Sequence, residues 1–325
     1  MDEIHAGGII FIQHLQQHFK GFSEYMLFLS HLGDPRNAFL VYFPIAYFIH
    51  HSVGKRVVLV AAISEWLNAI FKWLLHGERP YWWVQESNMY KEPPHLQQYR
   101  LTCETGPGSP SGHAMVTSSV LFLLVSEFIY YGKITRQRNF ILLVEVNIVL
   151  CDESVAGILL AVAFNSISTT SLSLKHYAMV SAMILISTVA AYYIILLLGF
   201  DPVWSVSVAT KWCARPEWIH LDTTLFYAMV RDCSCLLGMG LGLHLSGEDN
   251  SEWTPFSKLL LIIFSLAAAQ VEERIVISHH SQIVFYLLAS VKYIVLFVVI
   301  VSIIPKIGAA CNLVGYKKKD KLKKT

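Results

Sequence analysis

The stretch YAMVSAMILISTVAAYYIILLL, residues Tyr177–Leu198, contains 22 consecutive residues without one charged side chain. An α-helix of about 20 predominantly apolar residues is long enough to cross the hydrocarbon core of a bilayer. Backbone groups in lipid find no water, and a helix bonds all of them within one segment. This stretch therefore predicts a transmembrane helix.

Similar runs recur along the chain. Its 325 residues are 54% hydrophobic and 15% charged, whereas soluble domains carry about 25% charged residues. We predict an all-α, polytopic transmembrane helical bundle with about eight visible spans, built as a single membrane-embedded domain over residues 1–325. The further spans are Val57–Leu75, Ala114–Tyr131, Phe140–Phe164, Leu225–Leu245 and Ile283–Ile304, with the shorter Phe39–His50 and the marginal Leu259–Val271.

The two ends of the chain carry different signals. Residues 1–8, MDEIHAGG, lack a basic segment followed by a small-residue cleavage site, so we predict no removable signal peptide. Residues 306–325 hold seven lysines, and the positive-inside rule predicts a basic cytosolic tail. Lys321 and Lys323 also fit a KxKxx retrieval signal of the endoplasmic reticulum, a pattern that a lysine-rich tail meets easily by chance.

The six cysteines are scattered, without CxxC pairs or the spacing of metal ligands. This spacing predicts neither a disulfide framework nor a metal site. We expect no cofactor, and we expect the lipid bilayer, not nucleic acid, among the partners of the chain.

A cationic pair interrupts the apolar pattern in KWLLHGERPYWW, residues 72–83. Lys72 and Arg79 are seven positions apart, about two helical turns, so both can lie on one helical face. Pro80 then interrupts the helix, and the aromatic residues that follow it are typical of a membrane interface. A guanidinium fork beside an ammonium group suits phosphate oxygens. The pair predicts an anion site; alternatively, Lys72 simply extends its ammonium group to the interface.

The loop GSPSGHAM, residues 108–115, leads into the apolar run that starts at Ala114. Ser111 and Gly112 therefore lie at or near a helix N-terminus, where free N–H groups and the helix dipole favour an anion. His113 stands beside this position and is suited to protonate a departing oxygen near neutral pH. A capping loop with an incidental histidine is the alternative, and the nearby cationic pair favours the anion site.

These residues also carry a family resemblance. Lys72, Arg79 and Pro80, followed by Pro-Ser-Gly-His at 110–113, resemble the K-x6-R-P and P-S-G-H motifs of the type 2 phosphatidic acid phosphatase superfamily. Longer blocks in both halves of the chain resemble the catalytic subunits of glucose-6-phosphatase. These blocks are Gly33–Pro44, Glu65–Ser87, Cys103–Met115 and Lys211–Thr224.

The resemblance implies a nine-span enzyme of the endoplasmic reticulum membrane that acts in glucose metabolism and gluconeogenesis. It would hydrolyse glucose 6-phosphate to glucose and phosphate at the lumenal face, through a phosphohistidine and without metal or cofactor. By the motifs, Lys72, Arg79, Ser111 and Gly112 would bind the phosphoryl group, and His113 would be the general acid. The substrate would be a sugar phosphate, with a glucose-6-phosphate transporter as a candidate partner.

The third motif of the family, S-R-x5-H-x3-D, is not found after His113. Its histidine is the nucleophile of the family. The sequence of residues 146–164 reads as though the family pattern stops near Cys151 and resumes near Ser154. We therefore expect weak or no turnover from this chain.

Counting spans gives a second indication of a missing segment. With the loop from Arg79 to His113 in the lumen, the visible spans leave the lysine tail in the lumen as well, which contradicts the positive-inside rule. One additional span between Phe140 and Phe164 corrects the count. The lysine tail would also reach the cytosol if Leu259–Val271 did not cross the membrane. We favour an additional span between Phe140 and Phe164 over this alternative.

Asp152 and Glu153 lie inside the apolar run Phe140–Phe164, where carboxylates are costly. A substitute acid–base site is one interpretation, and a junction left by an altered exon join or an incomplete gene model is the favoured one. Three other functions stay open for the whole chain. They are a catalytically inactive, phosphate-binding or regulatory membrane protein, a related lipid phosphatase, and a transporter, for which paired broken helices are lacking.

Overall fold

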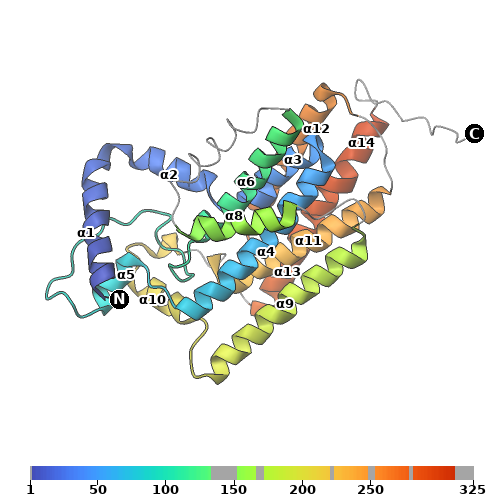
Figure 1. Cartoon of the computed structure of the whole chain (residues 1–325). Helices are drawn as coiled ribbons and strands as arrows, with labels where there is room; N and C mark the ends of the chain where they lie inside the picture. Colours follow the sequence, from blue (N-terminus) through green and yellow to red (C-terminus); the bar gives the residue numbers. More distant parts are fainter. Residues whose placement is uncertain are drawn as a thin grey trace, which may run out of the picture.

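A computed structural model of the chain describes residues 2–132, 152–165, 172–219, 223–247, 253–277 and 281–311. Within these ranges the chain forms helices and no β-strand (Figure 1). The longer helices are α4 (His51–Leu75), α6 (Gly112–Gly132), α8 (Asp152–Asn165), α9 (Leu174–Leu197), α11 (Leu225–Ser246), α12 (Pro255–Glu273) and α13 (Gln282–Val298). The others are α1 (Asp2–His18), α2 (Ser23–Leu32), α3 (Phe43–Ile49), α5 (Pro80–Glu86), α10 (Trp204–Trp212), α14 (Ile304–Ala310) and the short η1 (Lys20–Phe22), η2 (Ala38–Tyr42), η3 (Pro216–Trp218) and η5 (Val299–Ile303).

The predicted helical membrane bundle is confirmed. Five segments in the described part are long and apolar enough to cross a bilayer, and two apolar helices are shorter. The marginal prediction at Leu259–Val271 lies within α12, which has 19 residues and is one of the five. The five segments are His51–Glu86, Gly112–Tyr130, Leu174–Leu197, Pro255–Glu273 and Ile283–Ala310, and the shorter ones are Ala38–Ile49 and Val155–Phe164.

Helix α11 differs from the expected apolar span. It covers the predicted stretch Leu225–Leu245 but is not among those five segments, and it carries Arg231 and Asp232 in its buried interior. It packs against α9, α13 and α4, and so forms the centre of the bundle. The surrounding helices, not lipid, therefore enclose its charged side chains.

Small residues permit this close packing. A Cβ atom at Gly238 would lie 2.7 Å from Cβ of Phe297, and one at Gly240 would lie 2.8 Å from Cβ of Tyr177. Glycine at a helix interface lets the two backbones approach closely. The two glycines thus fit α11 between α13 on one side and α9 on the other.

The outer surface of the bundle is apolar. On α9, Met183, Ile186 and Leu197 have 63%, 68% and 85% of their surface exposed. Such a continuous apolar surface matches the hydrocarbon core of a bilayer. The fold therefore describes an integral membrane protein.

The first helices lie at one end of the bundle, to the left in Figure 1. Helix α1 contacts α5, where the His5 and Trp83 rings meet edge to face at 5.0 Å. Helix α5 in turn contacts α10. The loop between α5 and α6, which carries the Pro-Ser-Gly-His motif, belongs to this end of the molecule.

A disulfide joins Cys103, in that loop, to Cys213, just after α10. The scattered cysteines predicted no disulfide framework, and the structure nevertheless pairs two of them. The two cysteines are 110 residues apart and belong to no local pattern, so their spacing could not indicate the pairing.

Part of the predicted span Phe140–Phe164 falls on residues 140–151, outside the described residues. Helix α8 begins at Asp152, so Asp152 and Glu153 are its first two residues. It packs tightly on α6, because a Cβ atom at Gly157 would clash with the carbonyl oxygen of Met115. The predicted additional span and most of the lysine tail, residues 312–325, likewise lie outside the described residues.

Candidate active site

Lys72 and Arg79 lie on different elements. Lys72 is in the last turn of α4, which ends at His76 in a left-handed conformation with φ 49°. Arg79 has the extended backbone typical of a residue before proline, and Pro80 begins α5. The prediction that the two cations share one helical face was wrong. The chain between them turns instead, and the turn brings Arg79 against the loop that follows Cys103.

Two bonds fix the Arg79 side chain against that loop. Its Nε donates to the carbonyl oxygen of Gly106 at 2.8 Å, and its Nη2 donates to Oε2 of Glu104 at 2.8 Å. Both side chains of this ion pair are less than one fifth exposed. A half-buried guanidinium bonded at two points has a defined orientation.

Glycines let the loop after α4 and the loop before α6 lie in contact. The N–H of Gly108 donates to the carbonyl oxygen of Gly77 at 2.8 Å. A Cβ atom at Gly77 would lie 2.7 Å from Cβ of Ser109, and one at Gly108 would lie 2.6 Å from the carbonyl oxygen of Glu78. The Gly-Pro-rich composition of this region therefore serves the contact between the loops.

The predicted helix start after the Pro-Ser-Gly-His motif is confirmed. Helix α6 begins at Gly112, and Oγ of Ser111 accepts a bond from the Ala114 N–H at 3.3 Å. On α4, Nδ2 of Asn68 donates to the carbonyl oxygen of Pro110 at 3.2 Å. This contact joins the start of α6 to the helix that carries Lys72.

A small cavity of about 70 Å³ lies where these elements meet. It brings together Lys72, Gly112 and His113 from the predicted set, while Ser111 and Arg79 are not among its lining residues. Arg79 reaches the cavity wall through its bond to Glu104. The lining consists of Asp34, Pro35, Arg36, Glu65, Asn68, Ala69, Lys72, Glu104, Gly112, His113, Thr223, Leu225, Ala228, Met229 and Arg231.

Two carboxylates of this wall, Glu104 and Asp34, have lowered pKa values. Burial alone would raise the pKa of Glu104, but the charge of Arg79, reinforced by His113 and Lys72, outweighs burial and lowers this pKa. Burial likewise opposes ionisation of Asp34, and the hydrogen bonds and charge of Arg36 lower its pKa overall. Arg79 and Arg36 thus each favour the charged form of the carboxylate that they bind.

Arg231 lines the cavity but was not among the residues predicted for the site. Its side chain is 3% exposed and lies 2.7 Å from Oε2 of Glu65 and 2.8 Å from Oδ1 of Asp232. An Arg-Asp pair inside an apolar run was the available signal, because ionisable residues within spans mark functional sites by default. Asn68 was also missed, and nothing in its sequence context distinguishes it.

In the part of the chain that the structure describes, His113 is the histidine that lines the cavity, and no second histidine joins it. Among the same residues, no group of three or more histidine, cysteine or acidic side chains is arranged to hold a metal ion. The place of the missing third motif, between Cys151 and Ser154, lies at the edge of the described residues, because residues 133–151 fall outside them and α8 begins at Asp152.

Comparison with known proteins identifies the family. Residues 53–230 match the PAP2 superfamily. Human glucose-6-phosphatase 2 is 35% identical over 340 residues, covering 94% of this chain and 96% of the relative. The cat glucose-6-phosphatase catalytic subunit 1 is 34% identical, with coverages of 94% and 95%. Human glucose-6-phosphatase 3 is 34% identical over 267 residues, with coverages of 75% and 77%.

No solved structure matches the chain. The alignment with human glucose-6-phosphatase 2 runs over 340 positions although it uses only 94% of a 325-residue chain. The alignment therefore contains positions at which the relative has a residue and this chain has a gap. With both its superfamily region and nearly its whole length matched, the chain belongs to the glucose-6-phosphatase family, phosphoric monoester hydrolases of the PAP2 superfamily.

Proposed function

We propose that this chain binds glucose 6-phosphate in the cavity beside His113 and retains the acid half of the hydrolytic chemistry of its family. The observation that carries the proposal is the meeting of Lys72, Gly112 and His113 in one small cavity. Arg79 is bonded to Glu104 in the wall of that cavity. Anionic oxygens would thus meet an ammonium group, a guanidinium and a helix N-terminus at one place.

The roles follow from the chemistry of each group. Lys72 and Arg79 bind phosphoryl oxygens and stabilise the negative charge spread over them in the transition state. The backbone N–H groups near Ser111 and Gly112 contribute to the same site. His113 donates a proton to the sugar oxygen as the P–O bond breaks, so the sugar leaves as an alcohol and not as an alkoxide.

The nucleophile of the family is the missing part. The Ser-Arg motif with its histidine is absent from the sequence, and His113 has no second histidine beside it among the described lining residues. Without a phosphohistidine, water must attack the phosphorus directly, which is slower than covalent catalysis in two steps. We therefore expect weak or no turnover. These observations favour a phosphate-binding, catalytically impaired relative as the second candidate function.

The disulfide supports a lumenal position for the site. Disulfides persist in oxidising compartments such as the lumen of the endoplasmic reticulum. Glu104 directly follows Cys103 and lines the cavity, so the cavity would face the same compartment. A site on this side of the membrane would need a transporter to supply a cytosolic sugar phosphate.

The disulfide also constrains the number of membrane crossings. Cys103 and Cys213 lie on one side, so the chain between them crosses an even number of times. Among the described helices between the two cysteines, α6 and α9 are long enough to cross, whereas α8 and α10 are shorter. If α8 also crosses, the chain needs one further crossing outside the described residues, as the additional span predicted between Phe140 and Phe164 would supply.

Binding and turnover of the purified chain in lipid nanodiscs test the proposal. We expect inorganic phosphate and glucose 6-phosphate to bind, as measured by isothermal titration calorimetry, with little or no release of phosphate from glucose 6-phosphate. Failure of both ligands to bind would contradict the phosphate site. Rapid release of phosphate would contradict the catalytic defect and leave the phosphate site intact.

A further inference from the structure

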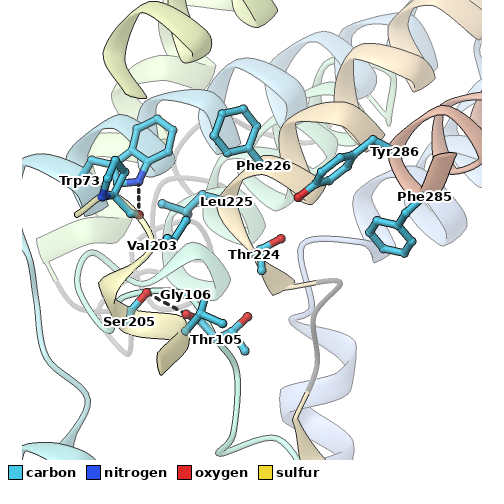
Figure 2. A pocket seen from close by; sticks show the side chains of 12 residues that line it. Trp73, Thr105, Gly106, Val203, Ser205, Thr224, Leu225, Phe226, Phe285 and Tyr286 are labelled. Carbon is cyan, nitrogen blue, oxygen red and sulfur yellow. Dashed lines mark hydrogen bonds between the residues drawn. The ribbon is translucent and has the colours of Figure 1, made fainter. Parts of the chain in front are cut away.

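A second cavity, of about 370 Å³, adjoins the phosphate cavity (Figure 2). Its volume falls within the range of small-molecule sites, about 300–1,000 Å³. It lies between the end of α4, the start of α10 and the first turns of α11 and α13. The lining residues are Trp73, Thr105, Gly106, Pro202, Val203, Ser205, Val206, Thr224, Leu225, Phe226, Phe285 and Tyr286.

The two cavities are neighbours. Leu225 lines both of them. Gly106 lines the larger cavity, and a Cβ atom on it would lie 3.7 Å from Nζ of Lys72, which lines the smaller one. A phosphate beside Lys72 would therefore place the rest of a phosphate ester within reach of the larger cavity.

The larger cavity is mainly apolar and aromatic. Figure 2 shows Trp73, Phe226 and Tyr286 around one side of it, with Leu225 and Val203 between them and the loop residues Thr105 and Gly106. The Trp73 and Phe226 rings lie 5.9 Å apart, centre to centre. Such a surface gains free energy by covering another apolar group.

The polar side chains in the lining already have partners inside the protein. Nε1 of Trp73 donates to the carbonyl oxygen of Pro202 at 3.0 Å, and Oγ of Ser205 donates to the carbonyl oxygen of Thr105 at 2.8 Å (dashed in Figure 2). These donors are therefore engaged. A ligand hydroxyl could donate to the lone pairs left on these oxygens, but neither group has a hydrogen left to donate to it.

The hydroxyl groups at the far side of the cavity are engaged as well. Oγ1 of Thr224 accepts from the backbone N–H of Tyr227 at 3.4 Å. The Thr105 and Thr223 hydroxyl oxygens lie 3.2 Å apart, within hydrogen-bond distance. Burying unpaired hydroxyl groups is costly, so this cavity favours an apolar group over a sugar ring with its several hydroxyls.

Apolar residues also surround the approach to the cavity. Val203, in its lining, has 46% of its surface exposed, and the preceding turn exposes Leu198 and Phe200 at 68% and 55%. These side chains offer apolar contacts beside the cavity, on both sides of the exposed Asp201.

We propose that the larger cavity binds the apolar group of an amphiphilic phosphate monoester whose phosphate lies beside Lys72. This proposal rests on the proposed phosphate site and extends its ligands to esters of apolar alcohols. Because the two cavities adjoin, a phosphate beside Lys72 leaves the rest of the ester in the larger cavity. Because the polar side chains there are already bonded within the protein, the larger cavity binds an apolar group in preference to a hydroxylated one.

Calorimetry on the full chain in nanodiscs, with empty nanodiscs as the partition control, tests this proposal. The ligands are inorganic phosphate, glucose 6-phosphate, 1-naphthyl phosphate and 1-naphthol. We expect 1-naphthyl phosphate to bind about 10-fold or more tightly than inorganic phosphate, because its rings bury apolar surface. We expect the affinity of glucose 6-phosphate to exceed that of inorganic phosphate by a much smaller factor. We expect 1-naphthol, which has no phosphate group, to bind weakly.

A variant with a larger side chain in the cavity tests whether the cavity causes this difference in affinity. Val203→Trp puts an indole at the cavity, and we expect the affinity ratio of naphthyl phosphate to phosphate to fall close to one. The matched control is Val276→Trp, at a position beyond α12 that is 89% exposed, where the ratio should not change. An unchanged ratio in Val203→Trp would overturn the assignment of the cavity.

The possible failures are distinguishable. If wild type binds inorganic phosphate but gains nothing from the naphthyl group, the apolar cavity proposal is overturned and the phosphate site stands. A larger gain for glucose 6-phosphate would make the cavity a sugar site and also overturn the proposal. If wild type binds no phosphate at all, both proposals fall together.

Discussion

At the scale of single residues, the candidate site depends on how Arg79 is held. Its guanidinium bonds to Glu104 and Gly106, so its orientation is fixed by the loop and not by its own helix. We expect Arg79→Ala to weaken inorganic phosphate binding by about 30-fold or more, about 2 kcal/mol, because it removes a cation and leaves Glu104 unpaired. Any residual phosphatase activity should disappear.

Arg215→Ala is the matched control for this prediction. Arg215 is 62% exposed and lies 3.9 Å from Glu217, a distance at which a surface ion pair contributes little. We expect phosphate affinity to stay within twofold of wild type in the control. Equal affinities in the two variants would exclude Arg79 from the phosphate site.

His113→Ala separates catalysis from binding. As the general acid, His113 acts on the leaving oxygen, so its loss should abolish whatever phosphate release the wild type shows. Inorganic phosphate has no leaving alcohol, and its affinity should fall less than in Arg79→Ala. Phosphate release at the wild-type rate by His113→Ala in microsomes would refute the assignment.

The Glu104 carboxylate gives the site a pH dependence. Burial opposes its ionisation, but the charge of Arg79 and then of His113 and Lys72 lowers its pKa below the usual value. A lowered folded-state pKa contributes stability above the unfolded carboxyl pKa of about 4.3, and this contribution is lost as pH falls through the folded value. Relative to Glu104→Gln, wild type should unfold about 2–4 °C higher at pH 7.

Thermal unfolding in nanodiscs between pH 7 and pH 3 measures this difference. We expect it to be constant down to about pH 5 and then to shrink as the carboxylate takes up a proton. A difference that grew on acidification would show that the Glu104 pKa is raised in the folded protein.

At the scale of elements, the packing of α11 depends on its glycines. A Cβ atom at Gly238 would lie 2.7 Å from Cβ of Phe297 and 2.8 Å from the carbonyl oxygen of Ile294. We expect Gly238→Ala to destabilise the bundle by about 1–3 kcal/mol, measured by thermal unfolding. Gly7→Ala on α1 is the matched control, since no atom lies within 4 Å of the new methyl group. A Gly238→Ala variant as stable as the control would contradict the close approach of α11 and α13.

The disulfide is the covalent link between elements. Peptide mapping without reduction should recover Cys103 linked to Cys213. The double variant Cys103→Ser/Cys213→Ser should lose about 5 kcal/mol in the chain-entropy account, given their separation of 110 residues. Cys311→Ser, at an exposed free thiol, is the control and should leave stability unchanged. Recovery of Cys103 as a free thiol would contradict the link.

At the scale of the whole molecule, the sequence predicted what repeats along the chain or lies close together in it. Apolar runs predicted the spans, and the Pro-Ser-Gly-His loop predicted the start of α6 near Gly112. Pairings between distant residues could not be predicted in this way. The Cys103–Cys213 bond and the contact of Glu65 with Arg231 join segments more than a hundred residues apart, and only the packing of the bundle brings them together.

The absent third motif predicts a gain of activity in the whole chain. Inserting a segment that carries the third motif of the family, S-R-x5-H-x3-D, between Cys151 and Ser154 should raise phosphate release from glucose 6-phosphate by orders of magnitude. The same insert with its nucleophile histidine changed to alanine is the control and should stay inactive. Equal activity with and without that histidine would show that the chain uses another nucleophile.

The link between Cys103 and Cys213 also orders events during biosynthesis. The ribosome completes Cys103 long before Cys213, so the bond closes only after the intervening helices have entered the membrane. Until then, the Cys103 thiol next to Glu104 has no Cys213 with which to pair. A nascent chain arrested before residue 213 would therefore carry a Cys103 thiol that is not yet paired with Cys213. Labelling of thiols in translation products of increasing length would show when the bond between the two cysteines forms.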